Sequence, residues 1–421
     1  MPPLQKLVHE VRCPIHGFIR FDALERRIID SRPVQRLKHI HQLAMTHQLY
    51  PGATHRRFEH SLGVMDLAGR AFDSLMQPGK RDYAAPTLPE VGDEQQRAYW
   101  RRVLRLSALL HDTGHLPFSH AAETELLPQG RNHESLTWKV VVDSEVAGIL
   151  QAATPPVRPE DVAKIAIAPS HLPKGQTLTP WEAIVNDIIT HPVFGVDRID
   201  YLLRDSHHAG VGYGRFDPLR LLDSFVIVRR PTRETVSETG LRGEHPEELV
   251  IGLEHGGLHG GESLLLARYF IWMQVYLHHV RRAYDIHLKD FMVAWLGDDR
   301  YPMEVEEHLR LTDEEVSAAI RVAATSRHSP GAAPARRIEA RNHFRLASRL
   351  RKDNFAVSRG VSPDIQLELA RALEDQYGAE QVRLDAYEAG SGAEEVFVVL
   401  DNGDVEDARQ HSDVLEHIPR A

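Results

Sequence analysis

The chain has 421 residues, of which 42% are hydrophobic and 26% charged, and its formal net charge is −10. A chain of this length and apolar content can bury a large core and is longer than one average domain, which argues against an intrinsically disordered protein. The negative net charge argues against general attraction to a nucleic-acid backbone, but a local cluster of arginine and histidine can still hold phosphate groups in a cleft.

Residue usage also restricts the location of the protein and the chemistry of any metal site. Met1–Val11 lack the apolar segment of a signal peptide, and no apolar run is long enough to cross a bilayer, so we expect a soluble, cytoplasmic protein. Because Cys13 is the only cysteine, cysteine-rich zinc sites and iron–sulfur clusters are excluded. A metal would therefore bind histidine, aspartate and glutamate, and the 26 histidines gather at 55–60, 111–120 and 278–287.

The first half of the chain is predicted to be helical after a short hairpin. In Leu7–Phe21, partial alternation, β-branched residues and a Pro/Gly break favour two short strands. Apolar residues then recur at helical spacing in four segments, which are Glu59–Leu75, Tyr99–Leu110, Pro180–Thr190 and Val196–Leu203.

The next part of the chain combines a ribbon with a helix. The apolar runs Phe225–Val228 and Leu249–Leu253 flank a charged segment, and we interpret residues 225–254 as an inserted β-ribbon. One long helix, rich in aromatic residues and histidine, is expected from Glu262 to about Leu296. Ser326–Arg341 is rich in Ala, Pro and Arg without clear periodicity, which favours a loop or linker.

The C-terminal part is predicted to be a small α+β module. A helix should begin at Pro363 after the N-cap Ser362 and end at Gly378. Strands are expected at Gln381–Tyr387 and Glu395–Leu400. We therefore divide the chain into a main domain at 1–325, a linker at 326–341 and the module at 342–421.

The densest chemical signal is the segment Ala108–His115, in which an apolar helix ends in the adjacent pair His111 and Asp112. Side chains at consecutive helical positions diverge, so these two can share one ion only if it lies beside the helix and distant residues complete its ligands. An isolated pair of this kind is most often a capped helix end. Here Gly114 breaks the helix at once, and His115 and His120 follow on the loop.

Two other segments offer partners for this pair. His60 lies at the start of a predicted helix, where a single histidine is more often structural than a ligand. In 195–205, the side chains of Asp197, Tyr201 and Asp205 fall four residues apart on one helical stripe. Such a stripe can be solvated surface, but the arginines beside it, Arg198 and Arg204, suit an anionic ligand.

The order of His60, then His111–Asp112, then Asp197 resembles the H…HD…D signature of HD phosphohydrolases. Longer blocks resemble one branch of that superfamily, the deoxynucleoside triphosphate triphosphohydrolases. This branch contains the sterile-alpha-motif/HD triphosphohydrolase and its bacterial homologues. These blocks are Pro14–Phe18, Gln35–Leu43, Tyr50–Val64 and His111–His120. The resemblance implies a mainly α fold, a helical bundle with small β-hairpin insertions.

The resemblance also implies the site residues. The implied metal ligands are His60, His111, Asp112 and Asp197, and the divalent ion they hold can be Mn, Fe, Ni, Zn or Mg. The implied catalytic residues are His133, His115, His120 and Asp205, with His133 as the acid that protonates the leaving oxygen.

Substrate contacts follow from the same resemblance. They are Gln42, Leu43, Arg57, Arg198, Tyr201, Arg268 and Tyr276. A second Arg–Tyr cluster at Arg281–Tyr284 permits an alternative register for the last two. Asp30 and Gln35 resemble residues of a regulatory nucleotide site shared between subunits, whereas Lys38 stands where relatives often have Arg. The resemblance implies a homotetramer and leaves the need for an activating nucleotide open.

The implied function is metal-dependent hydrolysis of deoxynucleoside triphosphates to deoxynucleoside and inorganic triphosphate, by attack of metal-activated water at the α-phosphorus. Two other functions stay open. One is an HD-type phosphodiesterase or nuclease acting on nucleic acid or a signalling nucleotide. The other is a non-catalytic nucleotide sensor. The reaction products distinguish these three functions.

Overall fold

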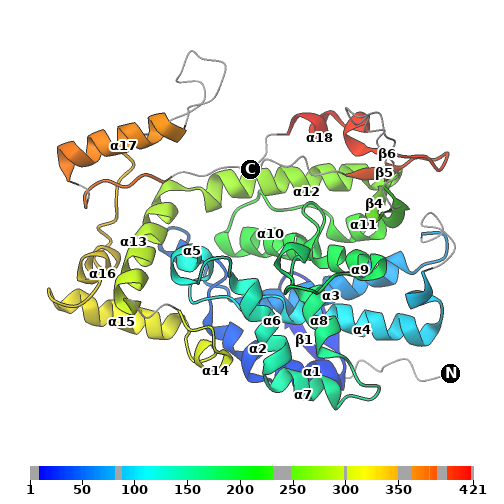
Figure 1. Ribbon diagram of the computed structural model, residues 1–421. Coiled ribbons are helices and arrows are strands. Elements are labelled where there is room, and N and C mark those ends of the chain that lie inside the picture. The colour runs from blue at the N-terminus through cyan, green and yellow to red at the C-terminus, as the bar shows by residue number, and fades with distance from the viewer. Residues whose placement is uncertain are drawn as a thin grey trace, which may run out of the picture.

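The computed structural model describes residues 9–80, 88–230, 248–297, 301–348, 363–378, 380–385 and 396–418. Helices dominate these residues, as predicted (Figure 1). The hairpin is confirmed, with β1 (His9–Cys13) and β2 (Gly17–Phe21) pairing in antiparallel register from His9 opposite Phe21 to Cys13 opposite Gly17. Gly17 has a φ of 74°, which suits glycine and lets the chain reverse there.

The large core is built on four predicted helices, all of which are confirmed. They are α3 (Arg57–Leu75), α4 (Glu94–Leu110), α9 (Pro180–Thr190) and α10 (Val196–Ala209). Local signals explain two of their ends. A capping box between Thr179 and Glu182 starts α9, and Gly210, at a φ of 71°, ends α10.

Shorter helices surround these four, and all but α5, whose Leu126 is buried in the second core, add residues to the same core. They are α1 (Ala23–Ile29), α2 (Arg32–Arg36), α5 (Glu123–Leu126), α6 (His133–Asp143), α7 (Glu145–Gln151), α8 (Pro159–Ala166) and α11 (Pro218–Asp223). Because α3 is buried along most of its length, its side chains contact elements on several sides. A histidine near its N-terminus is therefore held far from solvent.

The long helix expected from Glu262 to Leu296 was predicted wrongly, because two helices occupy this segment. α12 (Leu258–Ile271) continues into a π-helical turn at Trp272–Tyr276, and α13 (His279–Leu296) starts in a new direction (Figure 1). The side chain of His278 accepts a hydrogen bond from Val280 N and caps α13. π-turns inside helices are frequent at functional sites, and this one faces the cavity described below.

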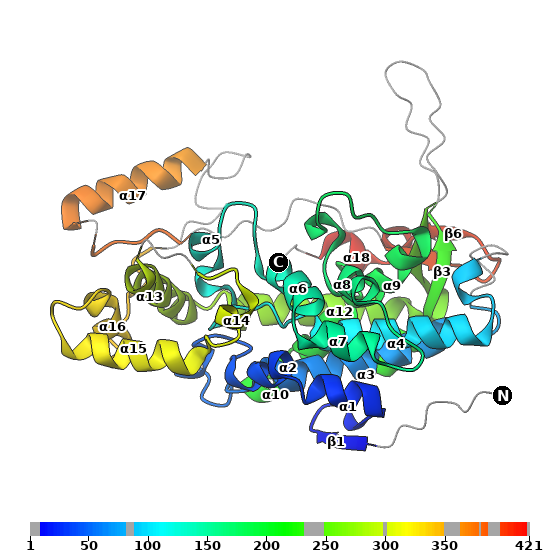
Figure 2. The same ribbon diagram turned by 60° about the horizontal axis from the view of Figure 1, so that its bottom comes forward.

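A second, smaller core lies beside the first, and Figure 2 shows its helices grouped to one side of α3 and α4. It contains α13, α14 (Val305–His308), α15 (Asp313–Thr325) and α16 (Ala332–Glu339). The prediction of a linker at Ser326–Arg341 was wrong, because α16 lies inside it. Ala332, Ala335 and Ile338 recur on one face and are buried against neighbouring helices, a short pattern that the alanine-rich composition obscured.

The sheet joins segments that are distant in sequence. The predicted ribbon is confirmed as β3 (Phe225–Arg229) and β4 (Leu249–Glu254), and β5 (Phe397–Val399) pairs parallel with β4. β6 (Val405–Asp407) completes the order β3-β4-β5-β6. Tertiary pairing thus brings the C-terminal strands to the edge of the inserted ribbon.

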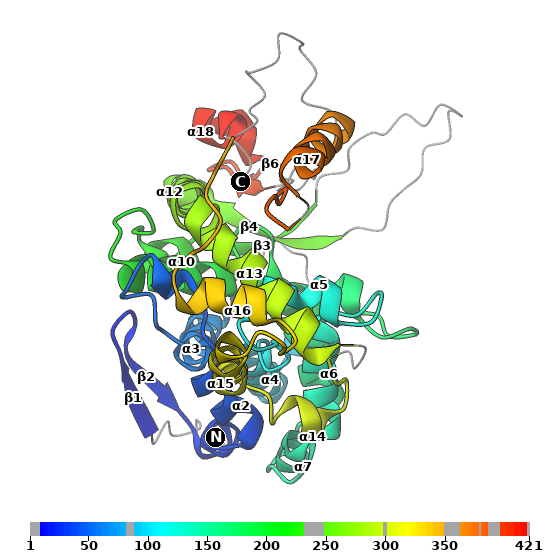
Figure 3. The ribbon, with the colours of Figure 1, turned by 90° about the vertical axis from the view of Figure 1, so that its left-hand side faces the viewer.

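The C-terminal helix prediction is confirmed by α17 (Pro363–Tyr377), which stands away from both cores in Figure 3, and α18 (Asp413–His417) follows β6. The strand expected at Gln381–Tyr387 was predicted wrongly, since 381–385 form no strand and 386–387 lie outside the described residues. The division into domains stays a prediction. Among the described helices, none has both the length and the apolar character needed to cross a bilayer.

Candidate active site

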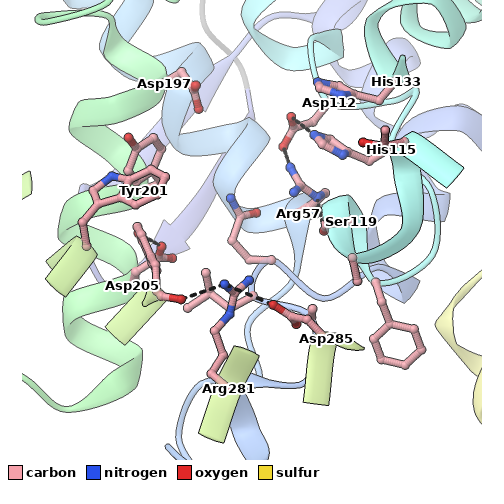
Figure 4. Close-up of a pocket in the computed structure, with 18 of the residues that line it drawn as sticks. Arg57, Asp112, His115, Ser119, His133, Asp197, Tyr201, Asp205, Arg281 and Asp285 are labelled. Atoms are coloured by element: carbon pink, nitrogen blue, oxygen red, sulfur yellow. Dashed lines mark hydrogen bonds and ion pairs between the residues drawn. The ribbon is translucent and has the colours of Figure 1, made fainter. Parts of the chain in front are cut away.

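A cavity of about 760 Å³ opens between the two cores (Figure 4). Its lining includes most of the residues that the sequence predicted. These are Gln42, Leu43, Arg57, His111, Asp112, His115, His133, Asp197, Arg198, Tyr201, Asp205 and Tyr276. The side chain of His120 lies outside the described part of the structure.

The four predicted metal ligands converge from three elements. His60 comes from α3, His111 and Asp112 from the end of α4, and Asp197 from the first turn of α10. His60 Nε2 lies 3.0 Å from Asp197 Oδ1 and 3.6 Å from Asp112 Oδ2. His111 Nε2 lies 3.3 Å from Asp112 Oδ1 and 3.5 Å from Asp197 Oδ1.

Hydrogen bonds orient both imidazoles for metal binding. The Nδ1 atom of His60 lies 2.7 Å from an Asp200 oxygen, and that of His111 lies 2.8 Å from the carbonyl oxygen of Ala108. Because both partners are acceptors, each Nδ1 carries a proton, and each Nε2 faces the carboxylates, where it can bind a cation once it is deprotonated. Within the described part of the chain, His111 Nε2 is buried and has no hydrogen-bond partner. This donor set fits a divalent cation.

The pKa of His60 agrees with this interpretation. Burial alone lowers it, but hydrogen bonds to Asp197 and Asp200 raise the pKa of His60 to about 10. A protonated imidazole therefore balances the carboxylates when no cation is bound. Binding of a cation displaces that proton, so we expect metal affinity to rise with pH.

Asp200 is a buried residue beside the metal cluster that the sequence analysis missed. Its carboxylate is fully buried and also accepts hydrogen bonds from His16 Nε2 at 2.5 Å and from Arg204 Nε at 2.8 Å. Although burial disfavours its charge, Arg204, His16 and His60 hold the pKa of Asp200 well below its usual range. The sequence analysis considered only residues spaced four apart, Asp197, Tyr201 and Asp205, and so passed over Asp200. Its spacing of three from Asp197 also places it near that helical face, and this was the available signal.

Arg57 connects the metal ligands to the loop after α4. Its Nη1 donates to Asp112 Oδ2 at 2.5 Å, and its Nε donates to Ser119 Oγ at 2.9 Å. All three side chains are buried. Arg57 thus compensates the charge of Asp112 and restricts its rotation.

His115 and His133 form a stacked pair beside Asp112, with ring centroids 3.9 Å apart. Burial, Arg57 and His133 hold the pKa of His115 well below its usual range, so His115 is neutral. His133 Nδ1 lies 2.8 Å from Glu123 Oε1, which also accepts the backbone N–H of His133. The Glu123 carboxylate therefore contacts Nδ1 of His133 and leaves Nε2 as the ring nitrogen on the other side. Glu123 was not predicted, although it follows His120 by three residues.

The opposite wall centres on Asp205 of α10. His55 Nε2 lies 2.7 Å from Asp205 Oδ1, and the Tyr276 hydroxyl donates to Asp205 Oδ2. Tyr201 packs edge-on against Tyr276, with ring centroids 6.4 Å apart. Burial and the Asp205 charge raise the pKa of Tyr276 well above its usual range, so the phenol stays neutral.

The positions of the arginines favour Arg281 over Arg268 as the predicted arginine contact of the substrate. Of the described residues, Arg268 does not line the cavity, and its Nη1 donates to Pro192 O at 3.2 Å. Arg281 lines it instead and contacts Tyr276 O at 2.8 Å and Asp285 Oδ2 at 3.2 Å (Figure 4). Arg282 and Lys289 on the same helix also line the cavity. For the tyrosine, the positions favour the first prediction, Tyr276, which lines the cavity. The alternative, Tyr284, is fully buried in the second core.

The predicted regulatory residues lie at the end of α1, in α2 and in the 3-10 turn that follows α2. Lys38 Nζ donates to Gln35 Oε1 at 2.7 Å, and Gln35 Nε2 donates to Ile29 O at 2.8 Å. Asp30 pairs with Arg26. These residues belong to a surface distinct from the described cavity lining.

Two family profiles match the chain, the HD domain over residues 57–205 and the HD associated region over residues 244–421. YwfO of Bacillus subtilis is 32% identical over 292 residues, or 68% of this chain and 56% of that protein. The deoxynucleoside triphosphate triphosphohydrolase SAMHD1 of mouse is 29% identical over 310 residues, or 68% of this chain and 44% of that enzyme. The matched part of this chain thus spans about half the length of these two relatives.

A solved structure is similar over a longer range. The crystal structure of an Aquifex aeolicus protein aligns with a TM-score of 0.72 at 28% identity, covering 98% of this chain and 94% of that one. HD domains bind divalent metal ions, and the cluster of His60, His111 and Asp112 supplies suitable ligands. The chain therefore contains an HD domain and an HD associated region, and it is similar to the SAMHD1 triphosphohydrolases.

Proposed function

We propose that this protein hydrolyses deoxynucleoside triphosphates to deoxynucleoside and inorganic triphosphate. The observation that carries the proposal is that two chemically different groups of residues line opposite sides of one cavity. The metal cluster and the His115–His133 pair form one wall, and Asp205 and Tyr276 form the other. Such a cavity offers separate places for a phosphate chain and a sugar. The dNTP triphosphohydrolase name of the SAMHD1 relatives supports this substrate class.

In this proposal the chain's own residues bind and orient the substrate and move one proton. A divalent cation bound at the cluster supplies Lewis-acid polarisation of a phosphoryl oxygen and lowers the pKa of water. His133 donates a proton from Nε2 to the departing 5′ oxygen while Glu123 stabilises the imidazolium through Nδ1, an acid contribution of about 10²–10⁴-fold. His115 stays neutral and keeps its stacked partner in place.

The remaining contacts define the substrate. Arg198 and Arg281 line the cavity and can bind phosphate oxygens with their planar guanidinium groups. Gln42 and Leu43 contact the sugar and base, and the Asp205 carboxylate accepts a hydrogen bond from a sugar hydroxyl. Tyr276 fills the space beside the sugar and excludes a 2′ hydroxyl by steric clash.

Product analysis tests the proposal. The protein is incubated with the four deoxy- and four ribonucleoside triphosphates, each with Mn, Mg or Fe, with and without an added activating nucleotide. We expect inorganic triphosphate and deoxynucleoside from the deoxy series. Shortened oligonucleotides from a nucleic-acid substrate, without triphosphate release, would instead establish a nuclease. Tight nucleotide binding without turnover would establish a sensor.

Assembly is part of the proposal. We expect a homotetramer whose formation depends on a nucleotide bound near Asp30, Gln35 and Lys38. Since Gln35 and Lys38 already bond each other, such a nucleotide must displace that contact. Light scattering that finds a fully active monomer at every nucleotide concentration would contradict it.

A further inference from the structure

The carboxylate of Asp313 in α15 contacts the loop that follows His111 and Asp112. Asp313 is the first residue of α15, and its side chain is 3% exposed. Its Oδ1 accepts a hydrogen bond from Phe118 N at 2.6 Å. Its Oδ2 accepts from His41 N at 2.7 Å and lies 2.6 Å from His41 Nδ1. Asp313 thus binds two segments that lie about 200 and 270 residues earlier in the chain.

The first segment is a turn that needs an outside partner. Phe118 and Ser119 have φ values of 56° and 63°, so two successive residues other than glycine adopt the left-handed conformation. Residues with a Cβ keep this conformation only where the surrounding structure imposes it. The hydrogen bond from Phe118 N to Asp313 is one such constraint. The turn places Ser119 Oγ where it accepts a hydrogen bond from Arg57 Nε and donates one to His41 O at 2.9 Å.

The second segment forms part of the cavity wall. His41 is held at its amide by Asp313 and at its carbonyl by Ser119, and its ring stacks on Phe118. The next two residues, Gln42 and Leu43, line the cavity. Asp313 therefore positions the end of the wall from which the proposed base and sugar contacts project.

These contacts form one connected path to the metal cluster. Asp313 holds the turn, Ser119 in the turn holds Arg57, and Arg57 donates to Asp112 at 2.5 Å. Arg36 makes a second link between the same regions, because it donates to the carbonyls of Leu311 and His115. The path begins in the part of the chain that matches the HD associated region and ends on a ligand inside the HD domain.

We propose that Asp313 is a positioning residue of the active site, which acts through the Phe118–Ser119 turn on Arg57 and Asp112. A carboxylate is required because the backbone N–H groups of Phe118 and His41 each donate to a different oxygen, and His41 Nδ1 lies 2.6 Å from one of these oxygens. The N-terminus of α15 also favours a negative charge at this position. An asparagine at 313 would present one acceptor oxygen and leave at least one of the buried donors without an acceptor. The predicted effect on turnover rests on the proposed function, whereas the predicted effect on metal binding does not.

The test compares Asp313→Asn with Glu314→Gln, the neighbouring acid of α15, whose exposed carboxylate contacts His39 and Thr312. We expect kcat to fall about 10- to 100-fold in Asp313→Asn, because a displacement of about 1 Å in a catalytic group has effects of this size. Affinity for Mn, measured by calorimetric titration without nucleotide, should fall severalfold. Glu314→Gln should retain both values within about twofold. Unchanged kcat and Mn affinity in Asp313→Asn would overturn the proposal.

A double-mutant cycle separates positioning from general loss of stability. Ser119→Ala removes the next link of the path, so Asp313→Asn combined with Ser119→Ala should lose little more activity than the more harmful single variant. Losses that multiply would show independent effects and overturn the proposal. If Asp313→Asn does not fold, His41→Ala takes its place in the cycle, with a smaller loss expected. If the wild type releases no triphosphate, the proposed function fails, and the Mn titrations still test the path.

Discussion

The wall of the cavity that carries the metal cluster and the wall formed by α13 hold their charged side chains in different ways. On the first wall, Arg204 and Asp200 are fully buried, and Arg57 and Asp112 are nearly so. On the second, Lys289 pairs with Glu125 and Arg282 with Asp385, and each of these four side chains is roughly one third exposed. A buried charge loses much stability when its partner is removed, whereas a surface pair contributes little.

The comparison indicates a division of work between the two walls. The metal wall is preorganised, since His60, His111 and Asp112 are each oriented by a second group before any cation binds. Arg282 and Lys289 of α13 can exchange an acidic partner for a phosphate at small cost, which suits the binding and release of substrate, whereas Arg281 and Asp285 form a less exposed pair. Substitutions on the metal wall should therefore affect turnover and metal content, and those on α13 should mainly affect substrate affinity.

The largest effect is expected at the metal ligands. His111→Ala or Asp112→Asn should abolish hydrolysis, because each removes a ligand without removing much core volume. Metal content, measured by elemental analysis, should fall in parallel while the circular dichroism spectrum stays helical. His259→Ala, at a highly exposed histidine, is the control and should keep both properties. Full activity in either ligand variant with metal below detection would refute the metal centre.

His133 should come next in size of effect. His133→Ala removes the proposed acid, so kcat should fall about 10²–10⁴-fold while metal content and nucleotide binding persist. Single-turnover rates and equilibrium binding measure the two quantities separately. If the metal is lost together with the rate, His133 is a ligand and its assignment as an acid is wrong.

A smaller effect is expected at Asp200, which orients His60 without belonging to the ligand set. Asp200→Asn should lower metal affinity about 10- to 100-fold, as is typical when a carboxylate that orients a ligating histidine is lost. The midpoint of thermal unfolding should also fall, because Arg204 loses a buried counter-charge. A titration that returns the wild-type metal affinity would show that His60 keeps its orientation without the Asp200 charge.

The smallest effect should distinguish the two candidate arginines on the substrate wall. Arg281→Ala should raise KM for the substrate about tenfold with little change in kcat, because a charge-assisted hydrogen bond to phosphate is removed. Arg268→Ala is the matched control, since Arg268 bonds Pro192 O instead of lining the cavity, and its KM should change less. A larger rise in KM for Arg268→Ala than for Arg281→Ala would identify Arg268 as the phosphate contact and rule out Arg281.

Local patterns in the sequence determined the helices and most of the metal cluster. The bounds of α9 depend on residues within a few positions of one another, so capping and periodicity predict them, whereas α10 continues to Ala209, beyond its predicted end at Leu203. The resemblance of the motifs around His60, His111–Asp112 and Asp197 supplied four residues that the structure brings within 4 Å of a neighbour in the cluster. In that case, long and specific motifs carried information that single residues did not.

Tertiary structure alone decided which buried groups support those residues. Asp200 pairs with His16 from 184 residues away, and Asp313 reaches Phe118 across 195 residues. For Asp200 the local pattern offered only its spacing of three from Asp197, and nothing in the local pattern around Asp313 distinguishes a buried acceptor from a solvated one. The break at Trp272–Tyr276 is similar, because the apolar pattern continues through it and only the packing of α13 on the second core redirects the chain. Long-range packing and hydrogen bonding set these features, and a single sequence does not record which distant segments meet.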